Sequence, residues 1–134
     1  MGDPGAQDEL AIRDLVARAS RLADADDVEA YVALFTSDAS WELPGGGRHG
    51  HDDIRAGAIE RRANGTVGPG TATRHTVGTV VVRVDGDHAT AESTWQFFTH
   101  TTTTPTLARL GTYHDQFVRT PDGWRIRRRT IEFG

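Results

Sequence analysis

A change of hydrophobic period near the middle of the chain most limits what this sequence can fold into. From His75 onward, apolar or β-branched residues alternate with polar ones over residues 75–84, 89–100, 107–120 and 124–133. Such alternation is typical of β-strands with one buried face. The sequences Asp85-Gly86 and Pro121-Asp122-Gly123 interrupt the pattern and are turn signals. The second half of the chain therefore predicts an antiparallel meander.

The first half of the chain has helical spacing instead. Apolar residues recur at the i, i+3, i+4, i+7 interval of a helix that buries one face. These residues are Ile12, Leu15, Val16, Ala19 and Leu22. Asp24 is therefore expected to fall in the last turn of this first helix.

Two more helices and a short strand follow before the meander. Asp26 with Glu29 three residues later predicts an N-cap and capping box that open a second helix. Residues 40–43 form a strand candidate, residues 44–47 a glycine turn, and residues 50–59 a third helix. Helices followed by an antiparallel meander predict an α+β fold with the helices on one face of the sheet.

Length and composition limit the class of protein. A chain of 134 residues is one domain, which we expect to span residues 8–134 after an unstructured segment of residues 1–7. The net charge of −4 does not indicate binding to nucleic acid or to an anionic membrane. Because the chain has no cysteine, disulfides and thiolate chemistry are excluded. No leader pattern or long apolar run is present, so we expect a cytoplasmic protein.

Asp24 is an acid in an unfavourable place. It falls in the last turn of the first helix, where the helix dipole is negative, and Asp26 and Asp27 follow across the turn. Capping explains Asp26 and Asp27 but not Asp24. Unless a cation or proton donor lies near its carboxylate, Asp24 destabilises the folded protein. This is the first indication of a functional site.

Other candidate side chains have two interpretations each. By alternation, His100 lies on the face opposite Trp95 and points away from a pocket unless a bulge intervenes. Arg129 fits either a solvated basic strand or an active-site cation, and Tyr113 fits either a core position or a phenol facing a cavity. The pair His49-Gly50-His51 has no third ligand nearby, so we expect no metal site.

The ordered set of local motifs resembles a known family. It comprises Asp24 to Asp27, Leu34 to Ala39, Gly50 to Ile54, Arg74-His75, Asp85 to Ala89, Gly111 to Phe117 and Asp122 to Ile126. From about Asp8 to the end, the chain resembles the SnoaL-like branch of the nuclear transport factor 2-like superfamily. The resemblance implies a cone-shaped, curved, mostly antiparallel sheet with three helices enclosing an apolar pocket. Because members include dehydratases, isomerases, cyclases, epoxide hydrolases and non-catalytic proteins, the fold alone does not decide the function.

Individual positions favour one group within that branch. Asp24 and His75 match the aspartate and histidine of scytalone dehydratase, bile-acid dehydratase and hexachlorocyclohexane dehydrochlorinase. The resemblance also places the second histidine of scytalone dehydratase at His100 and the arginine of the dehydrochlorinase at Arg129. The ketosteroid isomerase base would fall at Leu43, and its tyrosine at Ala19, so both of its working groups are missing. The two water-holding tyrosines of scytalone dehydratase correspond to Ala23 and Leu43, which is a departure from that enzyme.

The chemistry of an aspartate–histidine pair supports the same interpretation. Histidine exchanges protons near neutral pH, and a carboxylate on one ring nitrogen orients the ring and stabilises its charged form. The plain alternative is that His75 begins a strand and Asp24 is a solvated turn residue.

We therefore predict a cofactor-independent lyase that performs a dehydratase-type elimination on a small hydrophobic cyclic substrate, such as a polyketide, steroid or terpenoid. The expected catalytic residues are Asp24, His75, His100 and Arg129. The expected substrate-binding residues are Trp41, Leu43, Trp95, Phe97 and Tyr113.

Two alternatives remain open. The same dyad suits a cyclase or isomerase, and the cone alone suits a non-catalytic module that binds a hydrophobic ligand. The resemblance also implies a homodimer or higher homo-oligomer, for which the face carrying Thr90, Glu92, Thr94 and Gln96 is the candidate surface.

Overall fold

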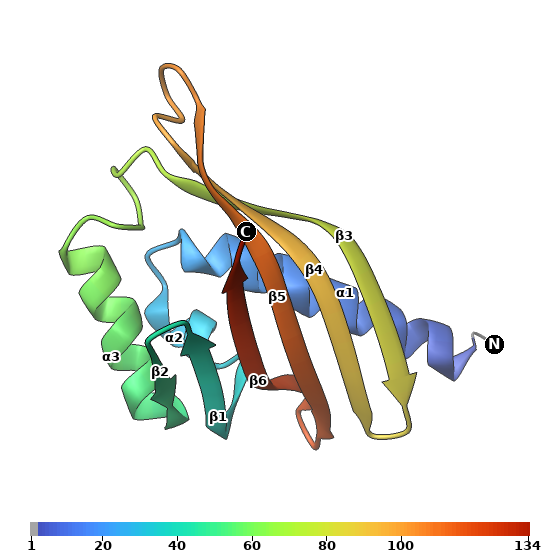
Figure 1. Ribbon diagram of the computed structural model, residues 1–134. Coiled ribbons are helices and arrows are strands. Elements are labelled where there is room, and N and C mark those ends of the chain that lie inside the picture. Colours follow the sequence, from blue (N-terminus) through green and yellow to red (C-terminus); the bar gives the residue numbers. More distant parts are fainter. Residues whose placement is uncertain (1–2) are drawn as a thin grey trace.

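The computed structural model describes residues 3–134 and has an α+β architecture, as the sequence predicts (Figure 1). Its helices are α1 (Pro4–Ala23), α2 (Val28–Val32) and α3 (Gly50–Ala63). Its strands are β1 (Phe35–Leu43), β2 (Gly46–His49), β3 (Arg74–Asp85), β4 (His88–Thr99), β5 (Thr106–Thr120) and β6 (Gly123–Phe133).

The strands form one curved sheet in the order β2-β1-β6-β5-β4-β3. All neighbours are antiparallel except β1 and β6, which are parallel. Helix α1 lies across one face of the sheet, and α2 and α3 lie at the end near β1 and β2 (Figure 1). Between these layers a core forms around Ile12, Val16, Phe35, Phe117 and Ile126.

Helix α1 begins earlier than the sequence analysis expects. Asp3 is its N-cap and accepts a hydrogen bond from the Gly5 backbone N–H at 2.9 Å, and Pro4 occupies the first turn. A proline there needs no N–H partner, and its fixed φ suits a helix start. Residues 4–7 are therefore helical, which corrects the expectation of an unstructured segment over residues 1–7; residues 1–2 lie outside the described part.

The expected start of the second helix is wrong by one residue. Asp27, and not Asp26, is the N-cap of α2, because its carboxylate accepts the backbone N–H of Ala30 at 3.0 Å. The helix ends after five residues at Val32.

The glycine run also differs from expectation. Only Pro44 and Gly45 form the turn, with Gly45 at a φ of 87°, while Gly46 and Gly47 pair with β1 as part of β2. A side chain on Gly47 would place its Cβ 3.0 Å from the carbonyl oxygen of Trp41, so the lack of a side chain permits this close strand. The glycine run, expected to be a turn throughout, is therefore a two-residue turn of a hairpin followed by the first two residues of β2.

Among the register shifts of the sheet, two β-bulges decide which side chains of β3 and β6 face the inside. In β3, the register with β4 shifts between Gly78 and Val81, and Thr79 has a φ of 45°. In β6, Arg127 is the extra residue, because Gln116 pairs with Arg128 whereas Phe117 pairs with Ile126. Each bulge reverses the alternation of the strand beyond it.

No helix in residues 3–134 combines the length and apolar character needed to cross a membrane. On the outer face of the sheet, Thr90 and Glu92 are exposed and Thr94 and Gln96 are half-buried. The pairing of this face with a second copy stays a prediction.

Candidate functional site

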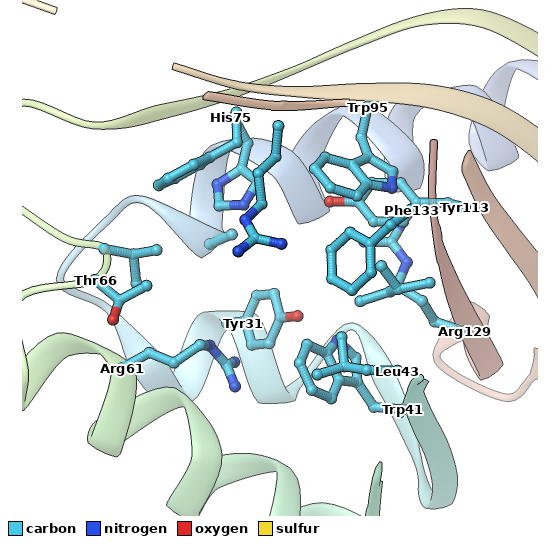
Figure 2. A pocket seen from close by; sticks show the side chains of 15 residues that line it. Tyr31, Trp41, Leu43, Arg61, Thr66, His75, Trp95, Tyr113, Arg129 and Phe133 are labelled. Carbon is cyan, nitrogen blue, oxygen red and sulfur yellow. The ribbon is translucent and has the colours of Figure 1, made fainter. Parts of the chain in front are cut away.

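A cavity of about 220 Å³ lies between the sheet and the helices (Figure 2). Its walls come from five strands (β1, β3, β4, β5 and β6), all three helices and the segment after α3, and they are mostly aromatic or aliphatic. The lining residues are Ala23, Tyr31, Trp41, Leu43, Arg61, Thr66, Val67, His75, Trp95, Phe97, Arg109, Tyr113, Arg129, Ile131 and Phe133. Trp95 and Phe97 thus form part of the wall and do not fill the space.

Asp24 and His75 are in direct contact at the wall of this cavity. The Asp24 Oδ1 lies 2.7 Å from the His75 Nδ1, and Oδ2 accepts the backbone N–H of His75 at 2.6 Å. Both side chains are largely buried, with exposed fractions of 18% for His75 and 16% for Asp24. The two contacts fix the position of the imidazole and direct Nδ1–H to the carboxylate, which leaves Nε2 as the nitrogen available to a ligand.

The two residues occupy different sides of that wall. His75 lines the cavity, whereas Asp24 lines a neighbouring groove beside the loop at Gly68 to Thr73, a groove that His75 also borders. Asp24 therefore reaches the cavity only through the imidazole. The plain interpretation of Asp24 as a solvated turn acid does not hold.

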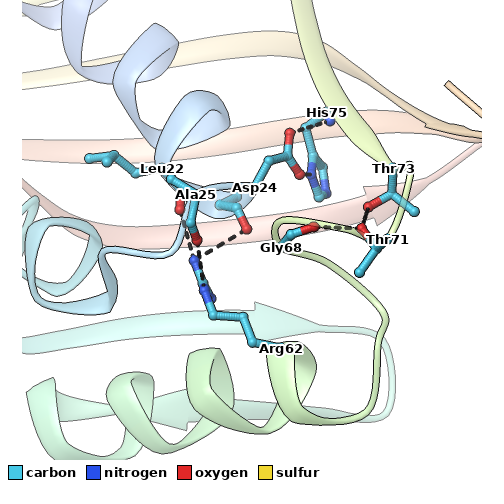
Figure 3. A network of polar contacts seen from close by, with 9 residues as sticks. Leu22, Asp24, Ala25, Arg62, Gly68, Thr71, Thr73 and His75 are labelled. Carbon is cyan, nitrogen blue, oxygen red and sulfur yellow. Dashed lines mark hydrogen bonds and ion pairs between the residues drawn. The ribbon is translucent and has the colours of Figure 1, made fainter. Parts of the chain in front are cut away.

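Arg62 stabilises the end of α1 that carries Asp24 (Figure 3). Its guanidinium donates to the carbonyl oxygens of Leu22 at 2.8 Å and Ala25 at 2.9 Å. A cation at the C-terminal end of a helix offsets the negative end of the dipole. The cation expected near Asp24 is therefore Arg62, but it binds the neighbouring backbone carbonyls. The Asp24 carboxylate itself is hydrogen-bonded to His75.

All five residues expected to bind substrate line the cavity, and one glycine shapes their arrangement. Trp95 in β4 pairs with Gly111 in β5. A Cβ on Gly111 would lie 2.5 Å from the Cζ2 of Trp95, so the indole lies flat across the strand only because residue 111 is glycine. Trp95 also stacks on Tyr113, with ring centroids 5.9 Å apart. Gly111 therefore permits the position of the Trp95 indole in the aromatic wall of the cavity.

The hydroxyl groups of Tyr31 and Tyr113 point into the cavity (Figure 2). Within residues 3–134 neither hydroxyl makes a hydrogen bond. Burial raises the pKa of Tyr113 to about 12, although the charge of Arg129 opposes this. Tyr113 therefore stays protonated at ordinary pH and is a hydrogen-bond donor.

Arg129 also lines the cavity, because the bulge at Arg127 reverses the alternation of β6. Its guanidinium forms two hydrogen bonds with the buried Asp115, from Nε at 2.8 Å and Nη2 at 2.9 Å. It also covers the ring of Tyr113 at 3.8 Å from the centroid. Burial alone lowers the pKa of Arg129, but the charge and hydrogen bonds of Asp115 outweigh it and leave the pKa above its usual value. Arg129 is thus a permanent cation whose charge is already paired.

His100 lies outside the cavity. It follows β4 at a φ of 54°, is exposed, and contacts the Thr99 hydroxyl at 3.1 Å. His100 borders neither the cavity nor the groove that contains Asp24, so we give it no role in the site. His49 and His51 are separated too, because His49 contacts the Ser40 hydroxyl at 3.1 Å and His51 contacts the Phe35 carbonyl at 2.7 Å.

Sequence reasoning missed several cavity residues: Tyr31, Arg61, Thr66, Val67, Arg109, Ile131 and Phe133. Two of them had a signal. Arg61 follows Ile54 and Ala58 at the i, i+4, i+7 spacing of a buried helix face, and Arg109 shares the alternation of Tyr113.

Comparisons with known proteins agree with this architecture. A family model described as a SnoaL-like domain matches residues 5–130. No curated protein matches the chain at a significant level. An NTF2-like protein with a cystatin-like fold from Novosphingobium aromaticivorans is similar, with 32% identity, a TM-score of 0.84, and coverage of 96% of this chain and 82% of that chain.

Two other solved structures extend the comparison. A protein of unknown function with a cystatin-like fold from Nostoc punctiforme has 26% identity and a TM-score of 0.85, covering 96% of this chain and 92% of that chain. A protein from Novosphingobium aromaticivorans, named as a candidate scytalone dehydratase, has 20% identity and a TM-score of 0.74, covering 96% of this chain and 88% of that chain. At that identity the likeness shows the fold alone.

Proposed function

This chain belongs to the SnoaL-like domain family, and we propose that it is a proton-transfer enzyme that dehydrates a small cyclic β-hydroxy carbonyl compound. The observation that carries the proposal is the 2.7 Å contact between Asp24 and His75, with His75 at the wall of an apolar cavity. A buried carboxylate behind a histidine, with the other ring nitrogen available, is the arrangement of a general base.

The proposed reaction is an elimination in which one residue moves the proton twice. Nε2 of His75 removes a proton from the carbon next to the carbonyl, and the electrons of that C–H bond form the new C=C bond as the C–O bond to the β-hydroxyl breaks. The imidazolium then returns the proton to the departing hydroxide, which leaves as water. Asp24 stabilises the imidazolium between these steps and acts as a positioning residue.

Tyr113 supplies a donor for the carbonyl oxygen of the substrate. Negative charge builds up on this oxygen as the α-proton leaves, and a donor in a dry site stabilises that charge more strongly than water does. Because its pKa is about 12, Tyr113 keeps its proton throughout the working pH range.

The volume of the cavity limits the size of the substrate. A cavity of about 150 Å³ holds benzene, so 220 Å³ suits one or two fused rings. A four-ring steroid is therefore too large to be enclosed. This narrows the expected substrates to monocyclic or bicyclic compounds.

Two probes test proton removal and elimination separately. 1-Tetralone has α-protons but no leaving group, so exchange of those protons in D2O, followed by NMR, measures proton abstraction alone. 3-Hydroxy-1-tetralone yields 1-naphthol on dehydration, which is followed by fluorescence. We expect His75→Gln to lower both rates at least a hundredfold and Asp24→Asn to lower them severalfold or more.

His100→Gln is the matched control, because His100 is an exposed histidine outside the cavity. It should leave both rates unchanged. If His75→Gln also leaves them unchanged, His75 is not the base and the proposal fails. Exchange without dehydration would favour an isomerase or cyclase, and the absence of both activities with intact ligand binding would favour a non-catalytic binding module.

A further inference from the structure

Arg61 is a cation inside the apolar cavity that lacks a counter-charge from the protein. It lies in the last turn of α3 and lines the cavity, where its guanidinium carbon is 4.6 Å from the ring centroid of Trp41. Across the described span of residues 3–134, Arg61 forms no hydrogen bond and no ion pair. The side chain is half-buried and also borders an open groove beside Gly45 to Arg48, so its charge is partly desolvated while its donors are unused.

The acids near Arg61 are already occupied. Glu60, its neighbour in the chain, binds Arg48 at 2.8 Å, and Asp53 binds the same arginine at 3.2 Å. Arg62 donates to backbone carbonyls at the end of α1. Among these three neighbouring arginines, Arg61 alone has its charge directed at the cavity without a partner in the described chain.

The local environment of Arg61 favours an anion. Burial lowers the pKa of Arg61, and the positive charges of Arg62 and Arg48 act in the same direction, while Tyr31 and Glu60 oppose them without reversing the shift. The Tyr31 hydroxyl, which lacks a partner among the described residues, faces the same space, and the Arg61 guanidinium points toward Tyr31 (Figure 2). A guanidinium and a phenol together supply the donors that a carboxylate accepts.

A glycine makes room for this arrangement. A Cβ on Gly57 would lie 3.1 Å from Nη1 of Arg61 and 3.0 Å from Nε of Arg48. Residue 57 therefore lets both guanidiniums lie close to α3, with Arg48 held by its two acids and Arg61 left free for the cavity.

We propose that Arg61, with the Tyr31 hydroxyl, binds a carboxylate of the ligand, so that the cavity takes small cyclic carboxylic acids. This inference rests on the proposed function only in using the same cavity. His75 enters the cavity from β3 and Arg61 from α3 on the other side (Figure 2). A bound acid therefore has its carboxylate at Arg61 and its reacting carbon toward His75.

A matched pair of probes isolates the charge of the ligand. 2-Naphthoate and 2-naphthamide have the same bicyclic shape, but only the first carries a carboxylate. Quenching of the fluorescence of Trp41 and Trp95, which line the cavity, reports binding of either probe. We expect the native protein to bind naphthoate at least tenfold more tightly than naphthamide.

Arg61→Gln should remove that preference by weakening naphthoate binding at least tenfold, and Tyr31→Phe should weaken it severalfold. The matched control is Arg127→Gln, which removes the same charge from the exposed bulge of β6 and should leave both affinities unchanged. If Arg61→Gln fails to fold, Arg61→Lys and Tyr31→Phe carry the test, since lysine keeps the charge but loses the paired donors.

Each outcome decides the inference. Equal affinities for the two probes, no binding of naphthoate at millimolar concentration, or an equal effect of Arg61→Gln and Arg127→Gln overturns it. The measurement is independent of turnover: a preference for naphthoate that depends on Arg61, together with no proton exchange from 1-tetralone, would support this inference while the proposed reaction fails.

Discussion

The buried pair of Asp115 and Arg129 allows a quantitative test of the structure. The side chains are 0% and 3% exposed and are joined by two hydrogen bonds of 2.8 and 2.9 Å. Asp115→Asn keeps the size of the side chain but removes its charge. The variant therefore leaves the Arg129 guanidinium buried without a counter-charge.

The expected cost is large. Removing one partner of a buried ion pair costs about 3–5 kcal/mol of the free energy of unfolding, out of about 5–15 kcal/mol for a typical domain. For a chain of this length, each kcal/mol corresponds to about 3.5 °C in the melting temperature. Asp115→Asn should therefore melt about 10–18 °C below the native protein.

An exposed pair on the same strand provides the control. Arg128 binds Glu42 at 2.9 Å, but the two side chains are 49% and 30% exposed. Glu42→Gln should change the free energy of unfolding by less than about 1 kcal/mol, because water screens this pair. Urea unfolding, followed by tryptophan fluorescence, measures both variants under one condition.

The double variant Asp115→Leu/Arg129→Met distinguishes the cost of desolvating the two charges from their mutual attraction in the free energy of unfolding. Because it removes both charges together, we expect it to be more stable than Asp115→Asn. If Asp115→Asn and Glu42→Gln have equal effects, Asp115 is not isolated from water and the argument is wrong.

Three further predictions concern other parts of the fold. Arg61→Leu should leave the melting temperature close to the native value while it abolishes naphthoate binding, because it removes a half-buried charge that forms no ion pair within residues 3–134; a large loss of stability would contradict this. Gly111→Ala should destabilise the protein by about 1–3 kcal/mol or more, because its Cβ meets Trp95 and the carbonyl of Glu132, and near-ultraviolet circular dichroism should show the tryptophan displaced. Hydrogen bonds from Arg119 and Trp124 lower the pKa of Asp8, so its contribution to stability is present above the unfolded pKa of about 3.9 and is lost as the pH falls through the lower folded value. The urea midpoint of Asp8→Asn should accordingly fall below the native one at pH 7 and approach it below pH 4, and a gap independent of pH would refute this.

The Asp24–His75 pair was predicted from the sequence by two different signals. Asp24 was unfavourable at a helix end, and His75 was singled out by the resemblance to a known family. Neither signal required knowledge of distant contacts, although only the fold shows the 2.7 Å separation of residues 51 positions apart. The aromatic wall was similarly visible, because Trp95 and Phe97 share one face of an uninterrupted strand.

Alternation failed where a strand contains a bulge. It left Arg129 between two interpretations, and only the extra residue at Arg127 turns the side chain inward, where Asp115 pairs with it. For His100, the turn after β4 decides the position. Arg61 was overlooked because the third helix was expected only over residues 50–59, whereas α3 continues to Ala63 and includes Arg61 in its last turn.

The sequence by itself determined the order and type of most elements and the α+β class, because hydrophobic period and helix-end chemistry act within a few residues of one another. The family, and the pairing of Asp24 with His75, came from the resemblance of its ordered motifs to known proteins. Only the tertiary structure decided the pairing of β1 with both β2 and β6, the two bulges, and the separate surroundings of Arg61 and Arg129. Those features depend on hydrogen bonds and charges contributed by segments far away in the chain, and the side-chain pattern of one segment holds no record of them.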